Sequence, residues 1–400
     1  MIHQINTVFV RIVMEIILSL LYIFHQFFDS NIDLFYVFFV FVIIKELFLS
    51  KKKMRFRLFI FIYFLILYAA LQIFSLEYVN LTKLVVYIFK FSINIYILIY
   101  LIEKNYLLKK LSKISYIISA FYLILLPISL AFKSELLWRL NDIANIYAKN
   151  RLKYFYVEPS ELSFHISIII IVLFNLFFYQ KNFKSRIITF LFILTNSIIL
   201  FMSAGLGGMI YLLISLFILI SLYIMKHMSN KVIFVSLLIL CLIILSGVLG
   251  DLQNSGFFQR VTDIVNGKDS STSYRFNTSF TVMKEMLKDT YGVGVGFGNL
   301  NTDYIRNKFS AYGLVDVISN SFMYFIAEGG IICLIALILF ITLLINKIKF
   351  TSITFQLPML LFILLYQIGG GYFTNPINWI IYGVIWTYPY NKNISNLRMR

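Results

Sequence analysis

The chain has 400 residues, of which 60% are hydrophobic and only 13% are charged, and its mean hydropathy is +0.86. Charged residues make up about a quarter of an ordinary soluble domain, so this composition excludes a soluble enzyme and indicates a polytopic membrane protein. The formal net charge of +17 would indicate a nucleic-acid partner only if it formed a basic patch on a water-facing domain. Most of the lysines and arginines lie instead in the loops described below.

Twelve apolar stretches follow one another along the chain, each near the roughly 17–25 residues that cross a hydrocarbon core. They are expected to be helices, because an isolated segment in lipid has no other way to satisfy its backbone hydrogen bonds. No internal repeat occurs at helix-pair spacing, which argues against an inverted-repeat transporter. The stretches lie near residues 5–28, 34–50, 56–76, 84–102, 114–132, 161–180, 186–204, 205–225, 231–249, 318–346, 352–370 and 375–390.

Lysine and arginine are concentrated in alternate connections, which predicts the orientation of the spans. The intervening short connections hold only Lys83, so twelve spans with both termini in the cytoplasm satisfy the pattern. The charge excess then reflects topology and anionic lipids. Two long loops, 133–160 and 250–315, are expected on the outer face of a single transmembrane domain, 1–400. The basic connections are 51–57, 104–113, 181–186, 226–231, 347–349 and the C-terminal tail.

Cysteine and histidine give no sign of a metal or redox site. Cys241 and Cys333 lie in separate apolar stretches, and the four histidines are scattered over different segments. This spacing predicts no disulfide, zinc site or other metal cluster.

Two segments of the outer loops have the apolar spacing of a helix. One covers residues 132–147 and contains Trp138 and Tyr147; the other covers residues 280–288. We expect both to lie on the membrane surface as interfacial anchors, with a lid or a lipid guide as the alternative role.

A charged segment precedes the sixth apolar stretch and is the first candidate for chemistry. Glu158, Pro159, Ser160 and Glu161 form an ordinary helix start, with proline in the first turn and acids near the positive end of the dipole. Arg151 lies seven residues upstream, and Arg275 lies in the other long loop. Two guanidinium groups and a carboxylate could together hold a diphosphate and deprotonate a hydroxyl.

Three glycine-rich stretches have different expected roles. The alternating run from Gly292 to Gly298 lacks the Gly-Lys-Ser/Thr ending of a phosphate loop, so it is either a re-entrant turn or a backbone cradle for a sugar or diphosphate. The stretches 203–208 and 369–371 lie at predicted outer helix ends. There, small residues are expected to serve tight turns and close helix packing.

The order of these features resembles the Wzy-type O-antigen and capsular repeat-unit polymerases, to which the O-antigen ligases are related. The resemblance covers about residues 151–345. It includes a final Asn320 followed by Glu328 and Gly330, and Ser319 stands where the ligases carry histidine. The earlier matching positions are Arg151, Glu158, Pro159, Ser160, Ser203 to Gly208, Arg275, the segment 280–290 and Gly292 to Gly298.

The resemblance implies an architecture like that of the GT-C membrane glycosyltransferases and an enzyme of the bacterial cytoplasmic membrane. A growing glycan would move from polyprenyl diphosphate to a hydroxyl of another lipid-linked repeat unit. Arg151 and Arg275 would stabilise the departing diphosphate, and Glu158 would be the base or would orient Arg151. It implies no metal or other cofactor. Its partners would be the lipid-linked oligosaccharide, membrane lipids, a chain-length regulator and a flippase, with no nucleic acid.

Further binding residues are expected around this centre. The aromatic rings of Tyr154, Tyr156 and Tyr274 would stack on sugar faces, or belong to the ordinary interfacial aromatic belt. Ser160, Asn320 and Glu328 complete the predicted substrate site. A ligase-like transferase that uses a different acceptor, and a polysaccharide transporter or flippase, remain the alternative functions.

Overall fold

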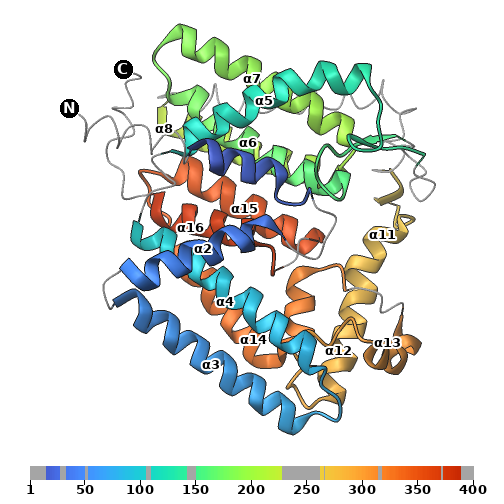
Figure 1. Cartoon of the computed structure of the whole chain (residues 1–400). Coiled ribbons are helices and arrows are strands. Elements are labelled where there is room, and N and C mark those ends of the chain that lie inside the picture. The colour runs from blue at the N-terminus through green and yellow to red at the C-terminus, as the bar shows by residue number, and fades with distance from the viewer. Residues whose placement is uncertain are drawn as a thin grey trace.

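The structure is a computed structural model of the chain, and it describes residues 15–27, 33–49, 53–104, 110–141, 150–227, 262–264, 266–313, 318–370 and 373–388. These residues are mostly helical (Figure 1). The helices of the bundle, in chain order, are Glu15–Phe24, α2 (Leu34–Leu49), α3 (Lys53–Ser75), α4 (Leu81–Lys104), α5 (Leu111–Ala131), α6 (Pro159–Tyr179), α7 (Phe183–Ser203), α8 (Leu206–His227), α14 (Ser321–Asn346), α15 (Ile353–Gly369) and α16 (Pro376–Thr387).

Shorter elements occupy the segments between these helices. They are the strands β1 (Trp138–Arg139) and β2 (Arg151–Leu152), the helices α11 (Ser270–Ser273), α12 (Ser279–Asp289) and α13 (Asp303–Phe309), the π-helical turn η1 (Tyr274–Thr278) and the 3₁₀ turn η2 (Ser310–Tyr312). In Figure 1, α11, α12 and α13 lie together along one side of the molecule.

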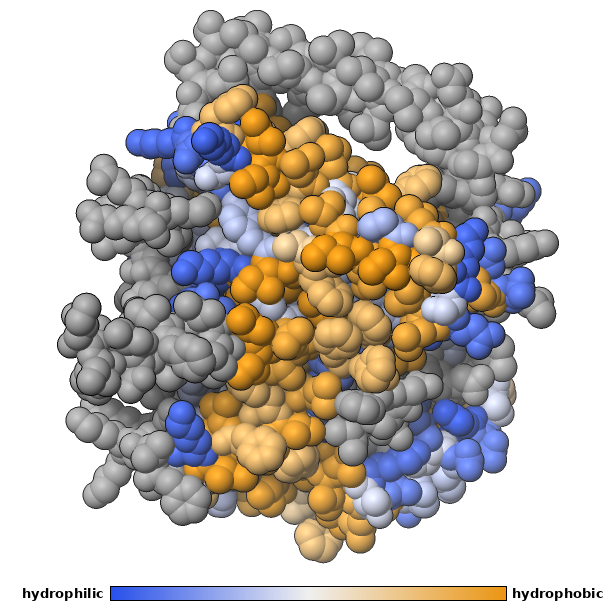
Figure 2. All heavy atoms as spheres, turned by 45° about the horizontal axis from the view of Figure 1, so that its top comes forward, coloured by the Kyte–Doolittle hydropathy of each residue, from blue (hydrophilic) through white to orange (hydrophobic). Residues whose placement is uncertain are grey.

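Seven helices of the described chain are long and apolar enough to cross a membrane: α3 to α8 and α14. The helix Glu15–Phe24, α2 and α15 are apolar but shorter. Figure 2 shows hydrophobic side chains over the middle of one face and hydrophilic ones toward its margins. The coarse prediction of an all-α, multi-pass membrane protein is therefore confirmed. The predicted span 231–249 lies outside the described residues.

Helix α6 is the centre of one half of the bundle, because it contacts α5, α7, α8 and α15. In the other half, α4 contacts α2, α3 and α16. Helices α15 and α16 lie between the two groups (Figure 1). Since α6 is buried over most of its length, it is a rigid element from which polar side chains can be positioned.

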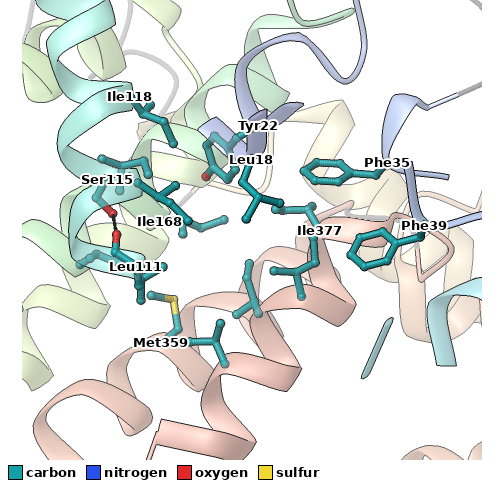
Figure 3. Close-up of a pocket in the computed structure, with 16 residues that line it drawn as sticks. Leu18, Tyr22, Phe35, Phe39, Leu111, Ser115, Ile118, Ile168, Met359 and Ile377 are labelled. Atoms are coloured by element: carbon teal, nitrogen blue, oxygen red, sulfur yellow. Dashed lines mark hydrogen bonds between the residues drawn. The ribbon is translucent and has the colours of Figure 1, made fainter. Parts of the chain in front are cut away.

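An apolar cavity of about 70 Å³ lies where these helices meet. Leu18, Phe39, Ile168, Met359 and Ile377 are among the side chains that surround it (Figure 3). The hydroxyl of Ser115 also lines it but donates to the carbonyl of Leu111, at 2.8 Å. A cavity with so few free polar partners does not favour water, and we assign no chemistry to it.

The helix predicted across 132–147 is wrong for its described part. Trp138 and Arg139 form β1, which pairs antiparallel with Arg151 and Leu152 of β2. The indole of Trp138 is buried and donates to the carbonyl of Ser129, at 2.9 Å. A local helical pattern could not anticipate this pairing, because the partner strand and the carbonyl come from neighbouring segments.

The second predicted surface helix is present, but its apolar face has a different partner. Val282, Met283 and Met286 of α12 are buried, and α12 packs against α14. The expectation of a simple interfacial anchor is corrected accordingly: this apolar face covers protein and leaves little to insert into lipid.

Candidate functional site

Arg275 of η1 lies against the C-terminal end of α15. A Cβ added to Gly370 would stand 3.8 Å from Cζ of Arg275 and 3.3 Å from the carbonyl oxygen of Ser319. The guanidinium also acts electrostatically on the hydroxyls of Tyr211 and Tyr366. Gly370 has φ +137, and its lack of a side chain leaves the approach to Arg275 open.

The other predicted loop reaches the same place. Pro159 begins α6 and the exposed Glu158 is its N-cap residue, as the sequence predicted. Glu158 and Glu161 both act electrostatically on Tyr366, as does Arg275. Two loops separated by more than a hundred residues therefore converge on Tyr366, whose ring stacks on Phe164 of α6, with 3.8 Å between ring centroids.

Arg151 has a structural partner within this arrangement. Its guanidinium donates to the carbonyls of Ser203, at 3.1 Å, and Ala204, at 3.4 Å. These carbonyls lie at the C-terminus of α7, where backbone acceptors lack helical donors and the dipole favours a cation. Arg151 thus joins the first loop to the end of α7.

The small residues after α7 serve close packing, as predicted. Ala204 adopts the left-handed conformation with φ 47, and side chains at Gly205 or Gly208 would collide with Ser163 of α6. A side chain at Gly369 would likewise collide with the Tyr211 ring. These glycines let α8 approach α6 and α15 closely beside the site.

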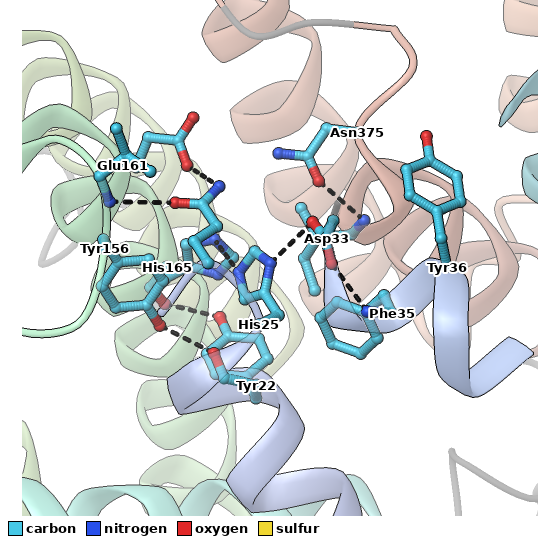
Figure 4. A network of polar contacts seen from close by, with 12 residues as sticks. Tyr22, His25, Asp33, Phe35, Tyr36, Tyr156, Glu161, His165 and Asn375 are labelled. Carbon is cyan, nitrogen blue, oxygen red and sulfur yellow. Dashed lines mark hydrogen bonds and ion pairs between the residues drawn. The ribbon is translucent and has the colours of Figure 1, made fainter. Parts of the chain in front are cut away.

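A buried polar network lies behind Glu161, and the sequence did not predict it (Figure 4). The Glu161 carboxylate accepts a hydrogen bond from the Gln26 side chain. His25 contacts Asp33 through Nδ1, at 2.8 Å, and His165 through Nε2, at 3.1 Å. His165 is four residues after Glu161, on the same face of α6, so that spacing was a signal. Nothing in the sequence indicated that His25 would be its neighbour.

The protonation of this network is constrained by its partners. If His25 is neutral and Nδ1–H donates to Asp33, its Nε2 accepts from His165. Nδ1 of His165 is then an unprotonated acceptor, buried and without a hydrogen-bond partner among the described residues. Asp33 thereby sets the tautomers of both rings. This series of hydrogen bonds connects the first helix, α2 and α6.

Tyr154 and Tyr156 do not fit the role of sugar platforms. Both are buried; Tyr154 stacks on Tyr122 and Tyr156 stacks on His165. Burial raises the pKa of Tyr154 to about 12, so the hydroxyl stays a neutral donor at physiological pH. We correct the predicted role: these rings hold the loop on α5 and α6. Tyr274, which is half-buried in η1, remains a candidate for substrate contact.

The glycine run does form a backbone cradle, but the group that it holds is internal to the protein, the buried side chain of Glu328. The N–H groups of Gly298 and Leu300 are directed at the carboxylate of Glu328, with 3.4 Å between Leu300 N and Oε1. Val295 and Gly296 donate their N–H groups to the carbonyls of Ala327 and Glu328. Because Glu328 is 0% exposed, the predicted direct contact with substrate is not available to it in this structure.

Ser160 and Asn320 act locally as helix-start residues. Ser160 Oγ donates to Glu158 Oε2, at 3.0 Å. Asn320 caps α14, where its side-chain oxygen accepts from the N–H groups of Phe322 and Met323, at 3.1 and 3.2 Å. Both geometries hold the site in place without requiring a substrate.

Replacing Asn320 separates capping from binding. We expect Asn320→Ala to lower the free energy of unfolding by about 1 kcal/mol, and Asn320→Ser to restore most of it, because serine caps nearly as well. Thermal unfolding in detergent measures this. A variant Asn320→Ser that is stable but has lost substrate affinity would show that the amide binds substrate after all.

No family model, curated protein or solved structure matches this chain. Among the described residues, no group of three or more His, Cys, Asp or Glu side chains is arranged to hold a metal ion. The fold and the site together define a class: a multi-pass helical membrane protein with a two-loop polar centre at one end of its bundle.

Proposed function

We propose that the chain is a polysaccharide repeat-unit polymerase of the Wzy type in a bacterial cytoplasmic membrane. Helices α6 and α8 begin, and α7 and α15 end, at the end of the bundle where Arg275 and Glu158 both lie within electrostatic range of Tyr366. In a twelve-span topology with cytoplasmic termini, that end is the outer face. Lipid-linked repeat units that have already been flipped would be available there.

The proposed reaction is a displacement at the anomeric carbon of the donor glycan. A hydroxyl oxygen of the acceptor forms the new glycosidic bond as the bond from the anomeric carbon to the diphosphate oxygen breaks. The acceptor proton passes to a carboxylate, and the diphosphate leaves with the bonding electron pair. Arg275 would stabilise that developing charge, with Tyr211 and Tyr366 as neutral donors beside it.

The structure favours a division of labour among the charged residues. Glu158 is exposed and accepts from Ser160, so its carboxylate can meet an acceptor hydroxyl and is the proposed base. Glu161 is held by Gln26 and is better suited to positioning. Arg151 is bound to the end of α7, and we propose that it contributes positive charge and holds the loop.

The convergence of Arg275 and Glu158 on Tyr366 carries this proposal. The test uses the purified full-length chain in liposomes with the diphosphate-linked repeat unit of its own host. Products that form a ladder of repeat-unit multiples are expected. A single product joined to a different acceptor would support the ligase-like alternative, and unreacted substrate in the presence of competent donor would refute both.

The buried Asp33–His25–His165 chain favours one second candidate, a proton-coupled polysaccharide transporter, because such chains serve as proton relays in membranes. Proteoliposomes with an imposed pH gradient separate the two functions. Glycan flux that depends on the gradient and is lost in His165→Phe would support transport. Polymer formation without a gradient would exclude it as the main activity.

A further inference from the structure

A second, open pocket lies beside the proposed site and has a volume of about 460 Å³. This is within the range of roughly 300–1,000 Å³ that small-molecule sites occupy. Lys83 and Lys90 of α4 both line it. They are seven residues apart, so they lie on one face of the helix about two turns from each other.

The charged side chains that line this pocket are all positive. Among the described residues, its lining contains both lysines and no aspartate or glutamate. Nζ of Lys83 donates to the carbonyl of Asn301, at 2.7 Å, and Nζ of Lys90 stands 5.8 Å from the centre of the Tyr36 ring. The nearby carboxylate of Glu328 is fully buried and faces the N–H groups of Gly298 and Leu300. The two lysines therefore bring positive charge to the open pocket.

The walls of the pocket suit an amphipathic ligand. Tyr87, Tyr324 and Phe373 supply aromatic surface, and Val86 is 46% exposed at the edge of the pocket. Oδ1 of Asn301 is buried and has no hydrogen-bond donor among the described residues. An acceptor of this kind matches a sugar hydroxyl, while the lysines match a phosphate.

The pocket and the first site are close to each other in the sequence after α15. Gly370 faces Arg275, and Phe373 and Thr374 line the pocket only three and four residues later. The Thr374 carbonyl accepts from the Tyr36 hydroxyl and from Nδ2 of Asn94, which fixes this wall. The centre at Arg275 and the pocket of the two lysines therefore lie near successive described residues at the end of α15 and just before α16.

We propose that the pocket of Lys83 and Lys90 binds the diphosphate head of a second lipid-linked glycan. The identity of this lipid rests on the proposed function, because a polymerase must hold two diphosphate-linked chains at once. Arg275 would hold the donor, and the lysines would hold the acceptor with its first sugar near Asn301 and its prenyl chain along the exposed face of α4.

The test measures how many equivalents of labelled polyprenyl diphosphate bind the full-length chain in phosphatidylcholine nanodiscs. We expect two for the wild type and one for the double variant Lys83→Gln/Lys90→Gln. Each lysine contributes about a tenfold change in affinity for the second equivalent, as expected for a charged hydrogen bond. The double variant with arginine at both positions should keep two, as should Lys133→Gln, which removes a lysine outside the pocket.

Competition identifies the source of the phosphate. We expect unlabelled polyprenyl diphosphate to displace the second equivalent, whereas phosphatidylglycerol or inorganic diphosphate at the same concentration does not. Equal displacement by phosphatidylglycerol would make this a general anionic-lipid site, and equal displacement by inorganic diphosphate would make it a site for a soluble anion. Either result would overturn the assignment.

If the variant Lys83→Gln/Lys90→Gln still binds two equivalents with unchanged affinity, the second equivalent does not bind in this pocket and the proposal is wrong. If that variant does not fold, Asn301→Asp places a carboxylate in the pocket instead and should lose the second equivalent; retention would be equally decisive against the proposal. This binding assay does not depend on catalytic activity. If the protein binds two equivalents but makes no polymer, the proposed polymerase function is refuted, while the assignment of the pocket as a diphosphate site still holds.

Discussion

The variant Arg275→Ala is expected to form polymer at least about a hundredfold more slowly than the wild type, a loss typical of removing a group that stabilises charge in a transition state. Arg275 faces Gly370 and acts on the hydroxyls of Tyr211 and Tyr366. Without its guanidinium, the departing diphosphate would keep only the neutral hydroxyls of these tyrosines and the charge of Arg151, which is already bound to the end of α7. The rate at which the product ladder grows is the measurement.

Two further variants make this prediction specific. Arg275→Lys retains the charge but loses the planar fork, so we expect an intermediate rate. Arg306→Ala removes an arginine of α13 from the same predicted loop, where it lies 4.0 Å from Asp303, and should leave the rate nearly unchanged. Equal losses in the variants Arg275→Ala and Arg306→Ala would show that positive charge anywhere in the loop is sufficient, which would remove Arg275 from the proposed centre.

Hydropathy predicted the helices well because the backbone of a membrane span has one dominant solution. The segments at α6, α7 and α14 are long and apolar, and they are helical in the structure. The N-cap position of Glu158 was also predictable, because it depends on the adjacent Pro159, and the small residues at Gly205 and Gly208 indicated close helix packing. Local patterns carry this information.

The polar contacts were less predictable because they depend on which helix faces pack against each other in the folded protein. His25 and His165 are 140 residues apart and yet 3.1 Å apart in space. Tyr366 and Tyr211 are ordinary members of apolar helices until α8, α15 and η1 are brought together. Tyr154 and Tyr156 show the converse error: aromatic residues in a predicted loop were expected at the substrate, but their rings complete the packing of α5 and α6.

The glycine run illustrates how one motif can have the predicted geometry and a different purpose. Gly330 interrupts α14 with φ 63 and ψ −157, and the run docks on that break. Ile331 N donates to the carbonyl of Gly292, at 2.9 Å, and Val295 N donates to that of Ala327, at 2.8 Å. The side chain of Gln72 joins α3 to the same junction through the carbonyl of Glu328, at 2.9 Å, and the N–H of Phe297, at 3.1 Å.

Replacing Gly294 by alanine is therefore expected to destabilise this junction by about 3 kcal/mol. Gly294 has φ +84, and an added Cβ would stand 2.6 Å from both the carbonyl oxygen of Glu328 and the nitrogen of Gly330. The left-handed conformation costs a residue with a Cβ roughly 1–2 kcal/mol, and overpacking against neighbouring atoms adds typically about 1–3 kcal/mol. The obstructing atoms are backbone, so they cannot turn away as a side chain would.

The variant Gly267→Ala separates these two costs. Gly267 also has positive φ, +69, but no atom of the described residues lies within 4 Å of its added Cβ, so the conformational cost of roughly 1–2 kcal/mol is the one we expect. Thermal unfolding of both variants in the same detergent should show the larger loss for Gly294→Ala. Equal losses would mean that the glycine run does not press on α14. The cradle around Glu328 would then be no tighter than an ordinary turn.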